Sequence, residues 1–224
     1  MKRGILDIEI KLPGVKLGIV EAQDVRVETV HPELAKLLDE VCARKQKEFT
    51  VESLAEAESI RAIRAVFRGW SMDPSKYRPS SEALLRRVVQ GKGLYRVSNV
   101  VDAGNLVSIE TGWPLGCYDR TRIQDTVILR HGAAGESYEG IGKKIWNLEG
   151  RPVLADSAGP FGRPISDSTR SMITDSTKDV MIVIYVPDKV SDEHADFAMK
   201  RLRERLTKFA GAANTQSTIC HPQK

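Results

Sequence analysis

Three polar residues, Asp102, Asn105 and Ser108, occur at intervals of three within an otherwise apolar stretch of this 224-residue chain. On an α-helix, residues three apart are neighbours on one surface. The positions around them are apolar on nearly every side of such a helix, which is typical of a buried helix. An unpaired polar group in the interior costs roughly 1–3 kcal/mol, so these side chains need partners. We therefore predict that this helix forms one wall of a ligand pocket.

The residues that follow mark where this helix ends. Gly112 can take the left-handed conformation that ends helices, and Pro114 cannot continue one. Glu110 lies just before this point, and residues 116–119 are expected to form a turn. Cys117 falls in that turn and could face the pocket, but the sequence shows no base that would activate it, so a structural thiol is favoured.

Residues 166–177 are the richest stretch in hydroxyl groups, and they lead directly into the apolar segment 180–186. An unbroken apolar strand is typical of a sheet covered on both faces, and binding groups tend to lie in loops beside such strands. Ser, Thr and Asp also form turns without any ligand, and this alternative stays open. Side chains from this loop and from the helix could orient a polar ligand and a water, which is nearly all that hydrolysis of an activated ester requires. The candidates are Asn105, Ser108, Glu110, Thr169, Arg170 and Thr174, to which we add Asp167 as a binding group.

A further polar group precedes the apolar pattern of residues 80–90. Tyr77 and Arg78 stand beside Ser80 and Ser81, one of which is expected to cap a helix. Free backbone N–H groups at a helix start attract anions, so this position could bind a carboxylate. An ordinary capped helix is an equally good interpretation. Tyr77, Arg78 and Ser81 are therefore candidate binding residues.

Positive charge is concentrated in one part of the chain. The net charge of the whole chain is only +4, but residues 61–92 carry eight Lys and Arg against two acids, a local excess of +6. Such a patch could contact RNA phosphates, although a solvated helix face would carry the same charges. The residues that we expect to contact RNA are Arg61, Arg64, Arg68, Arg86, Arg87 and Lys92.

The familiar motifs of other chemistries do not occur in the sequence. There is no CxxC or HExxH pattern for a metal, no GxSxG elbow and no phosphate-binding glycine loop, so we expect neither a metal nor a cofactor. Three widely spaced cysteines do not suggest a disulfide framework. No apolar run approaches the roughly 20 residues of a membrane span. We expect a cytoplasmic protein.

The periodicity of apolar residues predicts an α+β fold, with a mixed sheet flanked by helices. Strands are expected at 5–10, 16–22 and 25–30, forming a small meander, and later at 126–131, 152–156 and 180–186. Helices are expected at 32–47, 50–67, 80–90 and from Ser191 onward. A single domain is expected over residues 1–212, with strands and helices in 1–69, and residues 213–224 are expected to form a loose tail.

Several motifs in order resemble a known family. They are YRPSSEALLRRVVQGKGL, SNVVDAGNLVSIETGWPLGCYD, the GES loop and SDSTRSMITDSTKDVMIVIY. Together, over about residues 70–188, they resemble the B3/B4 tRNA-binding domain family, the editing module of the phenylalanyl-tRNA synthetase β chain. In the synthetase this module hydrolyses tyrosine attached to phenylalanine tRNA. The resemblance implies a B3/B4-like fold and an aminoacyl-tRNA deacylase that acts in trans. Its site residues would be Asn105, Ser108, Glu110, Ser171 and Thr177.

Two positions depart from the family pattern. Where the family usually reads PLHAFD, this chain reads PLGCYD, so Gly116 replaces the pocket histidine. A glutamate of the later strand falls near Val183. These changes imply a different amino acid, a different group to orient water, or no catalysis. The alternatives to a deacylase are a binder of amino acids without catalysis and an RNA-binding module with a vestigial pocket. The expected partners are the aminoacyl end of a tRNA and an amino acid.

Overall fold

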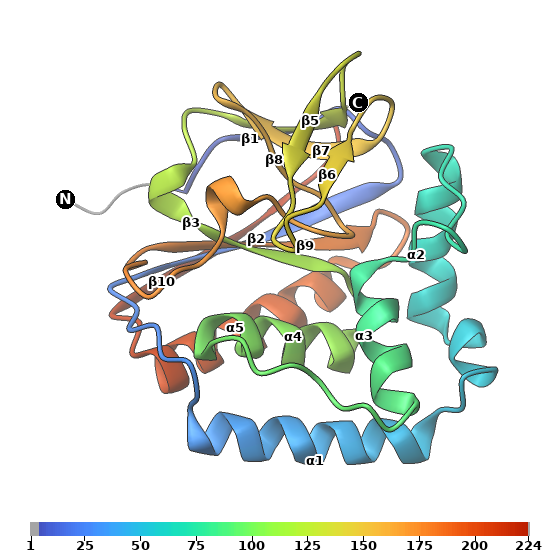
Figure 1. Cartoon of the computed structure of the whole chain (residues 1–224). Coiled ribbons are helices and arrows are strands. Elements are labelled where there is room, and N and C mark those ends of the chain that lie inside the picture. The colour runs from blue at the N-terminus through green and yellow to red at the C-terminus, as the bar shows by residue number, and fades with distance from the viewer. Residues whose placement is uncertain (1–4, 224) are drawn as a thin grey trace.

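The central sheet of the computed structural model, which describes residues 5–223, consists of four antiparallel strands. Their order is β10 (Asn214–Cys220), β2 (Val15–Gln23), β9 (Val180–Pro187) and β3 (Leu115–Asp119). Every residue of β9 is buried, because the strand lies between two others and has both faces covered. The apolar run in the sequence is thus the centre of the fold (Figure 1).

A second four-stranded sheet covers one face of the first. Its order is β1 (Ile8–Ile10), β4 (Val127–His131), β7 (Pro152–Asp156) and β8 (Gly159–Gly162). The pair β1–β4 is parallel and the others are antiparallel, so this sheet is mixed. Tyr118, Val183 and Tyr185 of the central sheet pack in one cluster with Leu154 and Phe161 of the second.

Helices cover the opposite face of the central sheet. α4 (Asn99–Thr111) and α5 (Asp192–Ala210) pack against it through residues such as Val107 and Leu202. α1 (Pro32–Glu48) and α3 (Ser80–Val89) form the next layer against α4, and α2 (Glu58–Gly69) stands beside them (Figure 1). A small hairpin, β5 (Ser137–Glu139) and β6 (Ile145–Asn147), projects from the second sheet. The expected α+β class, with a mixed sheet and flanking helices, is confirmed.

Several local expectations were wrong. The expected helix over 50–67 is a short 3₁₀ helix, η1 (Ser53–Glu56), followed by α2, because Ala57 has an extended ψ of 133°. Thr50 and Ser53 exchange hydrogen bonds between each backbone N–H and the other's hydroxyl, but the N-cap of η1 is Glu52, which makes no side-chain cap. No serine side chain caps α3, whose N-cap is Pro79.

Strand expectations also required correction. β1 and β2 belong to different sheets, and residues 25–30 form no strand because Val25 and Arg26 bond to Lys178 and Ala210 instead. Residues 116–119 lie in strand β3 and not in a turn. The supposed loose tail forms β10, which pairs with residues 17–23 of β2. No helix among residues 5–223 is long and apolar enough to span a membrane.

Candidate ligand site and basic face

Helix α4 has the boundaries that its sequence signals predict. The Ser98 hydroxyl accepts a hydrogen bond from the Val101 N–H at its start, and Gly112 ends it with φ of +79°. Gly104 lets the helix lie close to β3, since a Cβ there would be 2.9 Å from the Cys117 Sγ atom. This contact holds α4 against β3 of the central sheet.

The polar side chains of α4 do not act as one group. The Ser108 hydroxyl donates to the Trp113 carbonyl at 2.8 Å, so it closes the end of its own helix. Glu110 turns toward α5 and pairs with Arg205 at 2.7 Å. Asp102 accepts from the Val97 N–H at 3.1 Å. Asn105 alone of the predicted α4 residues is half-buried without a hydrogen bond to the described residues.

The two departures from the family pattern fall at one place in the central sheet. Gly116 and Val183 are directly opposite each other in the β3–β9 ladder. The Tyr118 side chain folds back over Gly116, and its hydroxyl occupies the space that a Cβ at 116 or at Gly162 would take. The position expected to hold a histidine is therefore filled by a tyrosine hydroxyl from the same strand.

That hydroxyl is bonded to a carboxylate of the hydroxyl-rich loop. Tyr118 Oη donates to Asp167 Oδ1 at 2.7 Å, and the Arg163 N–H points to the same oxygen at 3.4 Å. Desolvation raises the pKa of Asp167 to about 7, although both of these donors and the Arg163 charge oppose the shift. Burial and the Asp167 charge likewise raise the pKa of Tyr185 on the neighbouring strand. The region holds one carboxyl group that can change its charge near neutral pH.

The other predicted residues of the loop bond mainly to nearby chain. Thr169 donates to the Glu139 carbonyl at 3.3 Å, and Ser171 to that of Phe161 at 3.3 Å. Arg170 pairs with Asp156 at 2.9 Å. Thr174 and Thr177 bond to each other, and Thr177 also donates to Asp119 at 2.8 Å. These contacts stabilise the loop, as the turn-forming alternative predicts.

The three binding residues predicted around the start of α3 each contact different groups. Tyr77 accepts a hydrogen bond from Arg151 at 2.8 Å, and the two side chains stack with 4.2 Å between the guanidinium and the ring centroid. Ser81 is fully buried, and its hydroxyl has no partner among the described residues. Arg78 lies within 3.3 Å of Glu82.

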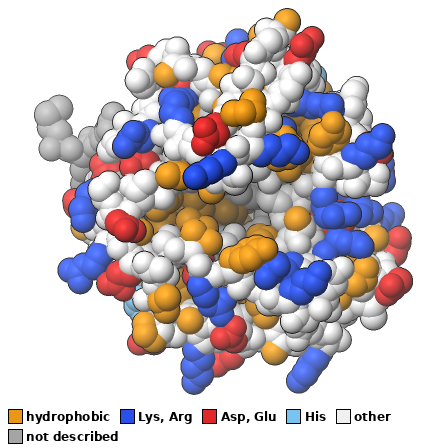
Figure 2. Space-filling model, viewed as in Figure 1, with side chains coloured by type: hydrophobic (Ala, Val, Ile, Leu, Met, Phe, Trp, Pro, Cys, Tyr) orange, Lys and Arg blue, Asp and Glu red, His pale blue; other side chains and the backbone are white. Residues whose placement is uncertain are grey.

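Figure 2 shows a hollow near the centre of the face seen in Figure 1. Its floor is apolar and lies over the central sheet, between the β5–β8 strands above and α4 below. Lys and Arg side chains gather on its rim, mostly on the side of α2 and α3. The hollow combines an apolar floor with a cationic border.

The basic face is organised around one buried carboxylate. Glu82 is fully buried, and Arg64 binds both of its oxygens at 2.6 and 2.8 Å. Arg78 and Arg86 approach the same group at 3.3 and 4.0 Å. Three guanidinium groups thus share one negative charge, which leaves a local excess of positive charge.

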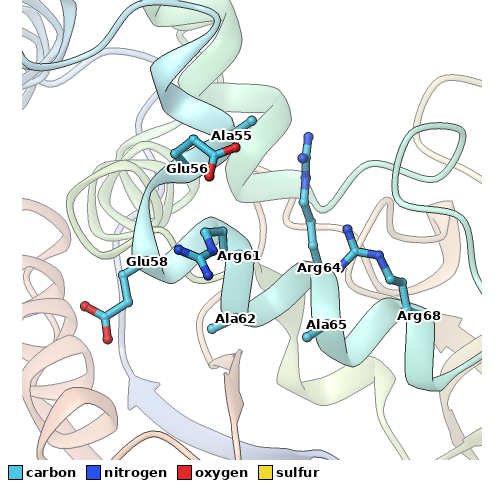
Figure 3. A pocket seen from close by; sticks show the side chains of 8 residues that line it. All are labelled: Ala55, Glu56, Glu58, Arg61, Ala62, Arg64, Ala65 and Arg68. Atoms are coloured by element: carbon cyan, nitrogen blue, oxygen red, sulfur yellow. The ribbon is translucent and has the colours of Figure 1, made fainter.

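Arg61, Arg64 and Arg68 stand along α2 over a groove of about 820 Å³ (Figure 3). Ala62 and Ala65 line the same groove. Of the other predicted RNA-binding residues, Arg86 belongs to the Glu82 cluster, while Arg87 and Lys92 lie at the far end of α3. The six predicted residues therefore divide between α2 and the C-terminal part of α3 with the turn that follows it.

Sequence reasoning missed Arg163, which is 2% exposed. Its guanidinium lies 4.2 Å from the Trp146 ring centroid, and its Nε donates to the Ser166 hydroxyl at 3.3 Å. It also missed Tyr118 as the residue that fills the space over Gly116. A tyrosine in a strand and an arginine in a Gly–Pro loop have no distinctive pattern, so the sequence carried no usable signal for either.

Comparison with known proteins defines the class to which this α+β chain belongs. The sequence model of the B3/4 domain matches residues 62–214, more than half of the chain. The chain therefore belongs to the B3/4 domain family.

Similar curated proteins are phenylalanine–tRNA ligase β subunits. That of Streptomyces avermitilis is 29% identical over 147 residues, which cover 60% of this chain and 18% of the ligase subunit. That of Symbiobacterium thermophilum is 29% identical over 162 residues, covering 71% and 18%. This chain thus spans less than a fifth of the length of these relatives. Among solved structures, an N-terminal fragment of the phenylalanyl-tRNA synthetase β subunit from Pyrococcus horikoshii is similar, with 14% sequence identity and a TM-score of 0.46. The match covers 97% of this chain and 51% of the fragment.

Proposed function

We propose that this protein binds the aminoacyl end of a tRNA in the central hollow and hydrolyses the ester, so that it acts in trans as an aminoacyl-tRNA deacylase of the cytoplasm. Membership of a family found in a tRNA ligase subunit supports an association with tRNA. The cationic rim of the hollow supports contact with phosphates. The hydrolytic step needs a group that activates water, and the chain must supply one without the family's histidine.

Asp167 is the best candidate for that group. The observation that carries the proposal is the Tyr118–Asp167 hydrogen bond, which holds a carboxyl group beside Gly116, where the family resemblance expects a histidine. A general base works best when its pKa is near the working pH, and the pKa of Asp167 is raised to about 7. Asn105 would position the water or the substrate from α4, since its amide is not engaged by the described residues.

The proposed chemistry is a single hydrolysis. The Asp167 carboxylate accepts a proton from water as the water oxygen attacks the ester carbonyl. The ester C–O bond then breaks, and the released tRNA hydroxyl takes up the proton, so that free amino acid and uncharged tRNA are the products. Ser108, Glu110 and Thr169 would act only indirectly, because each of them already bonds to neighbouring protein groups.

A panel of correctly and wrongly charged tRNAs tests this function, with the release of labelled amino acid as the measurement. We expect Asp167→Asn to lower kcat/KM at least about 100-fold, the size of a lost general base, with tRNA binding unchanged. Asp175→Asn is the matched control, since Asp175 is an exposed carboxylate of the same loop. The wild-type rate should rise with pH and level off above about pH 7. Activity that survives in Asp167→Asn would remove Asp167 from the mechanism.

A second candidate function is amino-acid or tRNA binding without catalysis. Gly116 and Val183 favour it, because they lie opposite each other on the paired strands β3 and β9. The histidine and the glutamate that the family resemblance expects are thus both absent from one place in the sheet. It predicts no deacylation of any charged tRNA, together with tRNA binding or a calorimetric signal with a free amino acid. Failure to bind either ligand would contradict both functions.

A further inference from the structure

The segment that joins α3 to α4, residues 90–98, carries a conspicuously exposed aromatic ring. Tyr95 is 62% exposed. In Figure 1 the segment crosses the front of the molecule between α1 and α4, on the face that bears the hollow of Figure 2. We propose that Tyr95 and Arg87 form a stacking site for an unpaired base in the single-stranded end of the RNA. This inference rests on the proposed function in requiring that the protein bind tRNA.

Arg87 and Tyr95 already form one half of such a site. The Arg87 guanidinium carbon lies 3.8 Å from the Tyr95 ring centroid. One of its nitrogens donates to the Tyr95 hydroxyl at 3.0 Å, and the other to the Lys92 carbonyl at 3.3 Å. Unpaired RNA bases are commonly bound by stacking on aromatic rings and on guanidinium planes. Because the ring remains well exposed with Arg87 in place, a base can add to the stack.

The segment is anchored on the C-terminal side of Tyr95. Arg96 pairs with Asp39 of α1 and also donates to the Ala35 carbonyl at 3.3 Å. The next residue, Val97, donates its N–H to the buried Asp102 carboxylate of α4 at 3.1 Å. On the other side, Lys92 bonds to the end of α3 through the Arg87 carbonyl. A ring held in this way loses little freedom when it binds a base, which favours affinity.

The charges around the ring indicate why the partner is RNA. Arg86, Arg87 and Lys92 lie on or just beyond the last turn of α3, and the Arg61–Arg68 row lies on neighbouring α2. Phosphates that follow a stacked base would meet these cations. The base must be unpaired, because bases inside a duplex are already stacked on each other. A single-stranded end beside a helical stem has both features.

Another exposed aromatic provides a matched control. Phe197 of α5 is 55% exposed and lies 5.9 Å from the Arg201 guanidinium carbon. Its surroundings are acidic as well as basic, since Glu110 and Glu193 line the same surface depression. The two rings thus share exposure and a nearby arginine, but Tyr95 packs on an arginine of the basic stretch 61–92 and Phe197 does not.

The test uses the full chain and two RNA hairpins, one with a short single-stranded 3′ overhang carrying 2-aminopurine and one with a blunt end. Tyr95→Ala should weaken binding of the overhang hairpin roughly five- to 150-fold, the loss of one base–aromatic stack. It should leave the blunt hairpin unaffected. Quenching of 2-aminopurine fluorescence should disappear in Tyr95→Ala and persist in Tyr95→Trp, which keeps an aromatic surface. Phe197→Ala should change neither measurement.

The outcomes separate this inference from the proposed function. Equal binding of the overhang hairpin by Tyr95→Ala and wild type, with quenching intact, would overturn the stacking site while RNA binding stands. If neither hairpin nor charged tRNA binds, the proposed function fails as well. We expect the wild type to bind the overhang hairpin more strongly than the blunt one. Of the three variants, only Tyr95→Ala should lose this preference.

Discussion

Two carboxyl groups in this protein, those of Glu82 and Asp167, are shielded from solvent but have different neighbours. Glu82 is fully buried at the start of α3, and three arginines lie within 4.0 Å of it. Asp167 is half-buried beside the central sheet, and its closest hydrogen bond comes from the neutral Tyr118 hydroxyl. The first group is neutralised by cations, whereas the second has its pKa raised to about 7 by desolvation.

The difference separates a positively charged face from an interior carboxyl group that can ionise near neutral pH. Around Glu82 the cations outnumber the anion, so the cluster joins α2 to α3 and leaves an excess of positive charge. Around Asp167 no salt bridge compensates the charge among the described residues, so the group can gain or lose a proton near neutral pH. The following predictions test whether the two environments differ as described.

Removal of the Glu82 charge should have the largest effect on stability. Glu82→Gln leaves Arg64, Arg78 and Arg86 close together without their shared anion, and breaking a buried ion pair costs about 3–5 kcal/mol. Urea denaturation would measure this loss. Glu136→Gln is the control, because the Arg130–Glu136 pair is 28% and 22% exposed and should contribute about 1 kcal/mol or less. Equal losses in the two variants would show that burial does not distinguish the pairs.

The Glu82 cluster also shows what the sequence could predict. The excess of +6 in residues 61–92 predicted a basic face, but no pattern indicated that one glutamate would gather three of its arginines. Arg64 and Glu82 lie on different helices, 18 positions apart. Only Arg86 stands four residues from Glu82 on the same helix, where helical spacing predicts an ion pair.

In the interior, too, local signals were predictable from the sequence and contacts between distant segments were not. The boundaries of α4 follow from Ser98 and Gly112, which are local signals, and β9 follows from its apolar run. The meeting of Gly116 with Val183 depends instead on the register of two strands far apart in sequence. β10 was missed because its residues are mostly polar and half-buried at a sheet edge, and so resemble a solvated tail. Pairing between distant segments decided the last two features, the Gly116–Val183 register and β10.

The pH dependence of stability should distinguish Asp167 from an ordinary carboxylate. Its pKa is 3.8 in the unfolded reference and about 7 in the folded protein, so between these values the folded state binds the extra proton. The contribution of Asp167 to the free energy of unfolding therefore falls as pH rises from about 4 to 7, by up to about 1.4 kcal/mol per pH unit, and then stays constant. Asp167→Asn cannot ionise and should lose this dependence.

Urea denaturation of both proteins at several pH values measures the effect. Relative to the wild type, Asp167→Asn should be increasingly stabilised up to about pH 7, since an asparagine oxygen can still accept the Tyr118 hydrogen bond. Asp175→Asn, with its exposed side chain, should run parallel to the wild type. A constant difference between Asp167→Asn and the wild type from pH 4 to 8 would mean that Asp167 has an ordinary pKa.

Gly116→Ala should have the smallest effect, and it tests the packing that supports Asp167. A Cβ at 116 would overlap the Tyr118 hydroxyl, so the tyrosine must shift, at a cost of about 1–3 kcal/mol typical of overpacked cores. Gly142→Ala is the control, because its Cβ would meet nothing within 4 Å. Tyr118→Phe removes the nearest overlapping atom, so the two changes together should destabilise by less than their sum. Strict additivity would show that the Tyr118 hydroxyl does not occupy the space over Gly116, and Asp167 would then need another source of its position.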